Sequence, residues 1–334
     1  MAAPQPLPHI FEPKALLQAQ VKWRLLESVF WAATLLPFFV TPTYLVLASQ
    51  IAITALFALS LDLIVGYCGL ISLGHAAFFG FGAYTAGILS AKAGWNEPLS
   101  GLLAAGLAAT ILGYLTSFII TRISHFALIM VTLGLNLLLY ELANKMYWLT
   151  GGDDGLQGVK MSPIFGVFRF DMYGQTAYVY TLVVLFVSFL ILRRLINSPF
   201  GLSLRGLREN PRRMPAIGAP SAKRIRMIYT ISATFAGLAG GLLAQTTQFV
   251  ALNALSFQLS AEVLVMLILG GTGRLYGGIV GAIIFLVARD QIADMNPQYW
   301  YFWLGLLLVV IIIFLPNGFL GGMAQLVSRI RSAK

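Results

Sequence analysis

The sequence predicts an all-α, polytopic membrane protein with about nine or ten transmembrane helices, some of them broken or re-entrant. Of its 334 residues, 58% are hydrophobic and only 10% are charged, and the mean hydropathy is +0.83. Soluble domains carry about a quarter charged residues. Nine of the 22 basic residues fall between Arg193 and Arg226, with Glu209 as the only acid among them. A basic loop between apolar runs is typical of the cytoplasmic side of a membrane protein.

Composition excludes several classes of function. The net charge of +10 does not indicate nucleic-acid binding, because the basic residues lie at the edges of apolar runs. The single cysteine, Cys68, allows neither an intrachain disulfide nor a zinc cluster. The sequence has no Walker A loop and no nucleophile elbow, so we expect neither a cofactor nor an ATP site in this chain.

The two ends of the chain are predicted to be cytoplasmic. Residues 1–27 are interrupted by prolines and charges, which does not fit a cleavable signal peptide and predicts a lead-in segment. Its part Ala15–Leu26 is amphipathic and suits the inner membrane surface. Residues 28–320 form the membrane domain, and residues 321–334 form a basic tail.

Charge-free runs mark the spans, because a helix of about 20 residues crosses the hydrocarbon core. Ser28–Leu61 is long enough for two spans, and Pro37 and Pro42 near its middle predict a tight turn at residues 41–43. The further runs taken as spans are Leu63–Ala91, which is rich in glycine, Pro98–Thr121, Ile123–Tyr140 extended to about Trp148, Met172–Leu192, Met227–Thr247 and Tyr299–Leu315.

The segments Val263–Gly273 and Leu275–Ala288 are less regular. They have only 11 and 14 residues and are divided by Arg274. Neither reaches the length of a full span. Short, glycine-interrupted apolar segments are typical of broken or re-entrant helices that line a cavity.

Charge asymmetry sets the predicted topology. With ten spans, both termini and the loop 193–226 lie on the cytoplasmic side, and the loop 151–174, with three acids and two basic residues, lies outside. The count of nine or ten stays open at this stage. The expected location is a bacterial inner membrane.

Four segments resemble the permeases of branched-chain amino-acid ABC transporters. They are Gly66–Gly80 (GYCGLISLGHAAFFG), Arg208–Arg213 (RENPRR), Thr150–Leu156 (TGGDDGL) and Gly270–Gly273 (GGTG). The third is similar to the outer loop of the second, M-type permease, and the likeness runs from about residue 45 to 320. The chain departs from the family pattern at Met214 and Pro215, where alanine-rich helix is expected, and at Gly278, where a proline is common.

The resemblance implies a permease subunit of an ABC importer that carries a branched-chain amino acid or a similar small polar solute. It implies separate ATPase subunits, a partner permease in a heterodimer, an external solute-binding protein and the lipid bilayer as partners. Relatives carry urea, short amides and aromatic acids, so the solute stays open.

The basic loop carries the candidate ATPase-coupling residues. Asn210 is a good N-cap and Pro211 suits the first helical position, while Pro215 limits the helix that follows to a short element. The alternative is that these charges only fix topology and contact anionic lipid. The predicted contact set is Arg205, Arg208, Glu209, Asn210, Arg212 and Arg213.

The glycine-rich segments carry the candidate translocation path. An interrupted helix exposes backbone N–H groups that can hold a passing carboxylate, although plain close packing of small residues is the alternative for each glycine. The candidates are Gly69, Ser72, Gly74, His75, Gly270, Gly271 and Gly273. For His75 we favour a structural role, as a neutral imidazole bonded to a neighbouring helix. Whether His75 or Asp62 contacts the solute stays open.

A second function remains to be weighed. An ion-coupled secondary transporter for a small solute would use Asp62, His75, Glu141 or Glu262 to carry its ion. An intramembrane enzyme is not supported, because the sequence offers no catalytic constellation.

Overall fold

The computed structural model describes residues 25–40, 44–123, 125–171, 173–211, 213–216, 218–315 and 318–323. In these ranges the chain is helical, and the extended pairings are two isolated β-bridges. The predicted all-α fold is confirmed. The lead-in up to residue 24, the turn at residues 41–43 and the tail from residue 324 lie outside the described residues.

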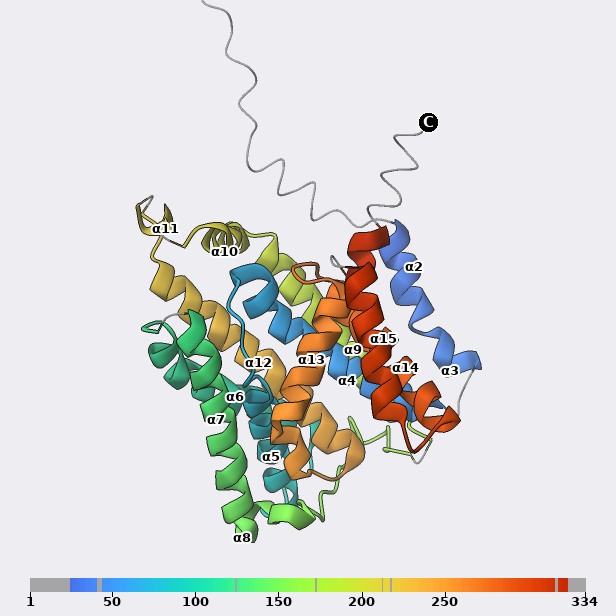
Figure 1. Cartoon of the computed structure of the whole chain (residues 1–334). Helices are drawn as coiled ribbons and strands as arrows, with labels where there is room; N and C mark the ends of the chain where they lie inside the picture. Colours follow the sequence, from blue (N-terminus) through green and yellow to red (C-terminus); the bar gives the residue numbers. More distant parts are fainter. Residues whose placement is uncertain are drawn as a thin grey trace, which may run out of the picture.

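Ten apolar helical segments of the described chain run alternately in opposite directions (Figure 1). Five of them are long and apolar enough to cross a membrane by length and composition alone, and others are shorter. The segments are α2 (Leu25–Ala33) with α3 (Leu36–Val40), α4 (Leu45–Asp62) with the π-helix η2 (Leu63–Cys68), α5 (Ala76–Ala91), α6 (Pro98–Ile120), α7 (His125–Lys145), α9 (Gln175–Ile196), α12 (Ser221–Thr247), α13 (Phe257–Gly270), α14 (Gly277–Met295) and α15 (Trp300–Phe314).

Short helices connect the segments at the two ends of the molecule. One end holds α10 (Pro199–Glu209) and α11 (Arg213–Ala216), together with the start of α2 and the end of α15 (Figure 1). The opposite end holds α8 (Tyr147–Thr150), η3 (Gly152–Asp154) and η4 (Leu252–Leu255). The start of α2 and the end of α15 lie at the same end of the molecule, as an even number of spans such as ten requires.

The predicted boundary at Asp62 is wrong. The second span continues through this residue and the π-helix η2 to Cys68. It ends at Gly69, whose φ of +77° lies in the left-handed region that glycine adopts without steric cost. Residues 69–75 then lead back into the molecule, where α5 begins. An ionised side chain normally ends an apolar run, but the Asp62 carboxylate is buried and hydrogen-bonded inside the bundle.

The predicted bounds of the two short segments near the C-terminus are also wrong. α13 begins at Phe257, and α14 continues through Arg289 and Asp290 to Met295. The two helices are antiparallel neighbours joined at residues 271–276, instead of fragments of one divided span (Figure 1). With 14 residues, α13 is only about 21 Å long and remains shorter than a full span.

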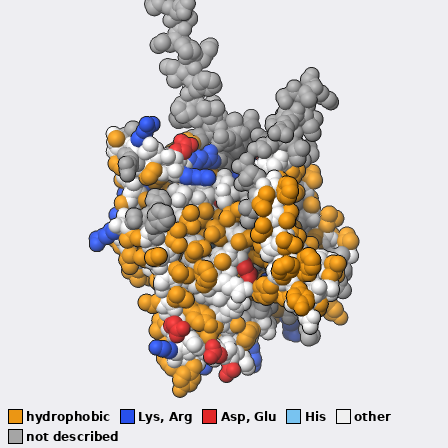
Figure 2. Space-filling view, viewed as in Figure 1, with side chains coloured by type: hydrophobic (Ala, Val, Ile, Leu, Met, Phe, Trp, Pro, Cys, Tyr) orange, Lys and Arg blue, Asp and Glu red, His pale blue; other side chains and the backbone are white. Residues whose placement is uncertain are grey.

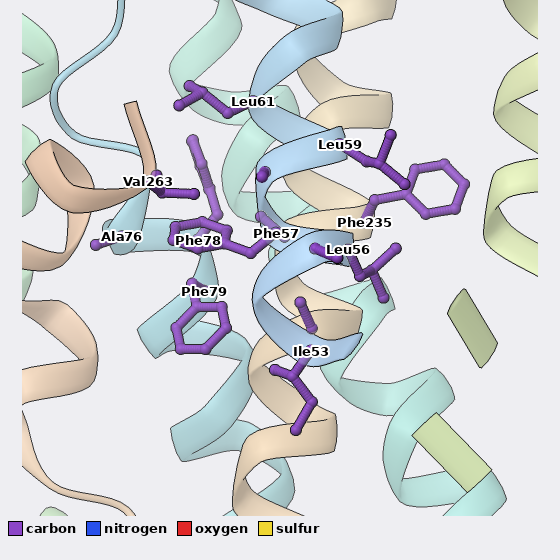
Figure 3. Packing of buried hydrophobic residues seen from close by; sticks show 14 of the residues in the cluster. Ile53, Leu56, Phe57, Leu59, Leu61, Ala76, Phe78, Phe79, Phe235 and Val263 are labelled. Carbon is purple, nitrogen blue, oxygen red and sulfur yellow. The ribbon is translucent and has the colours of Figure 1, made fainter. Parts of the chain in front are cut away.

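The core is built around α4, whose span is 83% buried inside the molecule. Figure 3 shows Phe57 of α4 next to Phe78 and Phe79 of α5, with Val263 of α13 nearby. The Phe57 and Phe79 ring centroids are 4.6 Å apart. Such aromatic contacts help fix α4 between the neighbouring helices.

Glycines let α5, α6 and α12 approach closely. A Cβ on Gly240 of α12 would overlap the carbonyl of Phe79, and a Cβ on Gly82 of α5 would overlap the backbone of Gly237. In a membrane, small residues of this kind allow helices to associate through backbone contact.

Candidate coupling surface and helix junction

α10 is an amphipathic helix that the sequence analysis did not anticipate. Ser198 caps it by accepting a hydrogen bond from the Gly201 N–H at 3.4 Å, and Pro199 occupies its first turn. Leu204 and Leu207 are buried, which fixes the helix to the body of the molecule. The Ser198–Pro199 pair was the available signal for this helix start.

The predicted short helix after Asn210 is present as α11. The Asn210 Oδ1 accepts from the Arg213 N–H at 3.2 Å, as an N-cap does. Met214 is buried and anchors α11. Pro220 is the N-cap residue of the next helix, α12, which starts at Ser221.

The predicted coupling residues divide into two groups by orientation. Glu209 and Arg213 are exposed, and so is the apolar Leu202 at 44%. Figure 2 shows Lys and Arg side chains gathered at the end that carries α10 and α11, above flanks covered by hydrophobic side chains. We call Leu202, Glu209 and Arg213 the docking surface; Arg212 lies outside the described residues.

Arg205 and Arg208 reach instead toward the π-helix η2. The Arg205 guanidinium lies over the Tyr67 ring, 5.7 Å from its centroid. The Arg208 Nη1 donates a hydrogen bond to the Gly66 carbonyl, although the residue as a whole is exposed. Both arginines therefore fasten α10 to the end of the second span.

Gly66 lies at a crossing of three segments. The Asp62 Oδ1 accepts from the Gly273 N–H at 2.8 Å, which joins α4 to the turn between α13 and α14. A Cβ on Gly66 would overlap Asp62 and the Gly273 nitrogen, and a Cβ on Gly273 would lie 2.7 Å from the Arg208 Nη1. We call Asp62, Gly66, Arg208 and Gly273 the helix junction.

His75 is fully buried and contacts both α4 and α12. Its Nε2 is 2.9 Å from the Ser60 Oγ of α4 and 3.4 Å from the Ser232 Oγ of α12, and its ring stacks on Phe57 at an interplanar angle of 7°. The Ser60 hydroxyl donates to the Phe57 carbonyl at 2.6 Å, so its single proton is used there. The His75 Nε2 must then donate, so this nitrogen carries a hydrogen.

The other candidates in the loop 69–75 also make packing contacts. Ser72 is 1% exposed, and a Cβ on Gly74 would overlap the Thr132 carbonyl of α7. The first N–H of α5, on Ala76, donates to the Ser260 Oγ at 2.9 Å. This helix start is therefore already bonded inside the chain.

Gly270 and Gly271 belong to the α13–α14 contact. A Cβ on Gly270 would overlap the Gly277 carbonyl, and Gly271 has a φ of +111° where α13 ends. Of the seven path candidates, Gly273 lies at the helix junction, Gly69 borders Arg208, and Ser72, Gly74 and His75 lie deeper between helices. Asp62, which the sequence analysis left open as a solute contact, also lies at the helix junction.

These features define a class of protein: a multi-pass membrane protein with a basic arm, formed by α10 and α11, at one end. Among the described residues, no group of three His, Cys, Asp or Glu side chains could hold a metal ion. The arm is fixed to the interior through arginines, and helices of the interior approach one another at glycines.

Comparison with known proteins places the chain within this class. The family model described as "Branched-chain amino acid transport system / permease component" matches residues 43–312. The chain belongs to this family, whose members are the membrane-spanning permeases of ABC importers, so the resemblance noted in the sequence is confirmed.

Curated relatives agree with the family assignment. The high-affinity branched-chain amino acid transport system permease protein LivM of Salmonella typhimurium is 31% identical over 93% of this chain and 79% of its own length. The LivM protein of Escherichia coli is 30% identical over 92% of this chain and 78% of its own length. A probable LivM protein of Methanocaldococcus jannaschii is 28% identical over 42% of this chain and 46% of its own. No solved structure matches the chain.

Proposed function

We propose that this permease moves a branched-chain amino acid across the bacterial inner membrane, powered by ATP hydrolysis in a separate subunit. The observation that carries the proposal is the family match over residues 43–312, together with LivM relatives whose printed names describe branched-chain amino acid transport. No family match or relative of this kind supports the ion-coupled secondary transporter. Asp62 and His75 are engaged in hydrogen bonds between helices.

The docking surface is the proposed contact with the ATPase. Leu202, Glu209 and Arg213 combine an apolar residue with charges of both signs on an exposed arm. A rigid arm of this kind can seat in a groove and pass on a displacement. Basic residues at this end also support its placement in the cytoplasm, with the chain termini on the same side.

A second permease and an external solute-binding protein complete the proposed importer. Exposed apolar side chains on α7 and α15 support contact with lipid or with another membrane subunit. These side chains include Met130, at 77% exposed, and Ile313, at 69%. The expected assembly is a heterodimer of permeases with two ATPase subunits.

Uptake in proteoliposomes tests the transport proposal. The chain is reconstituted with its partner permease, the ATPase subunits and the binding protein, and radiolabelled leucine uptake is measured with internal ATP or with a pH or sodium gradient alone. We expect uptake only with ATP and the binding protein. Uptake by this chain alone, driven by a gradient and indifferent to ATP, would support the secondary transporter instead.

Charge reversal tests the docking surface. The double variant Glu209→Lys with Arg213→Glu should insert normally but lose ATPase subunits during affinity purification. The matched control is Lys223→Glu, which reverses an exposed charge in the first turn of α12. Equal ATPase recovery from the double variant and the control would show that the charges only set topology.

A further inference from the structure

We infer that Arg208 is a positioning residue that transmits the movement of α10 to the two glycine-rich helix ends inside the bundle. The inference rests on the proposed function and deepens it. It assigns ATPase binding to the docking surface and force transmission to the helix junction. Arg208 thereby has a different role from Arg213, although both belong to the same basic arm.

The first support is where Arg208 makes its contacts. Its guanidinium donates to the Gly66 carbonyl, and its Cγ lies 3.0 Å from the place a Cβ on Gly69 would take. Gly66 belongs to the π-helix η2, and Gly69 ends it in the left-handed region. A π-helical turn is a local change of helical pitch that is rare and often occurs at functional sites.

The second support is that the same carbonyl group lies against the α13–α14 turn. A Cβ on Gly273 would lie 2.9 Å from the Gly66 oxygen and 2.7 Å from the Arg208 Nη1, and the Gly273 N–H donates to Asp62 at 2.8 Å. A displacement of Arg208 must therefore act on both η2 and this turn. The helix ends that lead into α5 and α14 are thus mechanically joined.

The third support is that α10 has a separate attachment that does not touch the junction. Arg224 of α12 lies over the Phe200 ring of α10, 5.6 Å from its centroid. Arg208 and Arg224 thus fix the same helix to two different places. This gives a matched pair of variants with the same change of side chain.

The test uses the full reconstituted importer with Arg208→Gln and Arg224→Gln. For Arg208→Gln we expect ATPase subunits to co-purify as in the parent and ATP to be hydrolysed, while leucine uptake per ATP falls about tenfold or more. Arg208→Lys, which keeps one donor to the Gly66 carbonyl, should restore part of this ratio. Arg224→Gln should leave the ratio within about twofold of the parent.

Three results would overturn the inference. Loss of ATPase subunits from Arg208→Gln would make Arg208 a docking residue, and an unchanged uptake ratio would remove it from transmission. Equal losses of leucine uptake per ATP in the Arg208 and Arg224 variants would mean that transmission needs α10 to be attached but does not depend on the helix junction. In each case ATP-driven uptake by the parent complex would leave the proposed function standing.

A measurement on the parent complex avoids reliance on variants that fail to fold. Backbone hydrogen exchange is compared between the nucleotide-free and the ATP-bound importer. We expect exchange to change together in residues 199–209, 63–69 and 271–276. A change confined to residues 199–209 would overturn the inference.

Discussion

Replacing Asp62 by alanine removes the acceptor that holds the α13–α14 turn against the second span. The Asp62 Oδ1 accepts from the Gly273 N–H at 2.8 Å, and the residue is only 1% exposed. After the substitution the Gly273 N–H has lost this acceptor at a part-buried position. A matched substitution, Asp62→Asn, keeps an oxygen where Oδ1 lies, replaces Oδ2 by an amide NH2 group and cannot carry a negative charge.

The size of the effect follows from the cost of a buried unpaired donor. Leaving such a group without an acceptor costs about 1–3 kcal/mol. For domains of about 150–250 residues, each kcal/mol lowers the thermal midpoint by about 2–4 °C, and we apply the same range to this chain. We therefore expect Asp62→Ala to unfold between about 2 and 12 °C below the parent, and Asp62→Asn to lose less than half as much.

The chain contains a reporter for this measurement. Cys68 is its single cysteine and is buried in η2, so a thiol-reactive fluorogenic dye reports thermal opening of this region. A midpoint for Asp62→Ala equal to that of the parent would refute the proposed hydrogen-bond role. An equal loss in Asp62→Asn would show that the charge matters more than the acceptor.

Two further predictions concern packing inside the bundle. For His75→Asn we expect near-normal leucine uptake, because the imidazole serves as a hydrogen-bonded spacer to Ser60; abolished uptake by a normally folded variant would show a direct role in transport. For Gly240→Ala we expect a loss of about 1–3 kcal/mol in stability, since its Cβ would overlap the Phe79 carbonyl. Gly305→Ala is the control, because nothing lies within 4 Å of its Cβ position. Comparable thermal midpoints for the two glycine variants would refute the close-packing argument.

Local sequence signals were sufficient for much of the fold. Apolar run length located the long spans, and the Pro37 and Pro42 pair correctly divided the first run into two segments. The Asn210 cap and Pro215 predicted the position of α11. These features depend on residues close in sequence, where helix length, capping and proline geometry act directly.

The helix junction could not be predicted in the same way. Asp62 and Gly273 are 211 residues apart, and Arg208 and Gly66 are 142 apart. Nothing local shows that an aspartate at the end of an apolar run is bonded inside the bundle. The predicted coupling set placed Arg208 with Arg213 for the same reason. The direction of a side chain on α10 depends on residues distant in sequence against which the helix packs.

The candidates for the translocation path were also only partly predictable from local sequence. Glycine-rich sequence correctly marked the places where helices end or approach, such as Gly69 and Gly270. It could not separate close packing from a solute path, because both need small residues. Asp62 entered as a candidate ion carrier and as an open solute contact, and its bond to the Gly273 N–H became visible once the helices were placed.

The cytoplasmic position of the arm is tested most directly by labelling Ala216→Cys with a membrane-impermeant maleimide. Ala216 is exposed on α11, whereas Cys68 is buried and gives little background. We expect no labelling in intact cells, strong labelling in inside-out vesicles, and protection there when the ATPase subunits are bound. Labelling in intact cells would place α11 outside the cell and contradict the proposed contact between the docking surface and the ATPase.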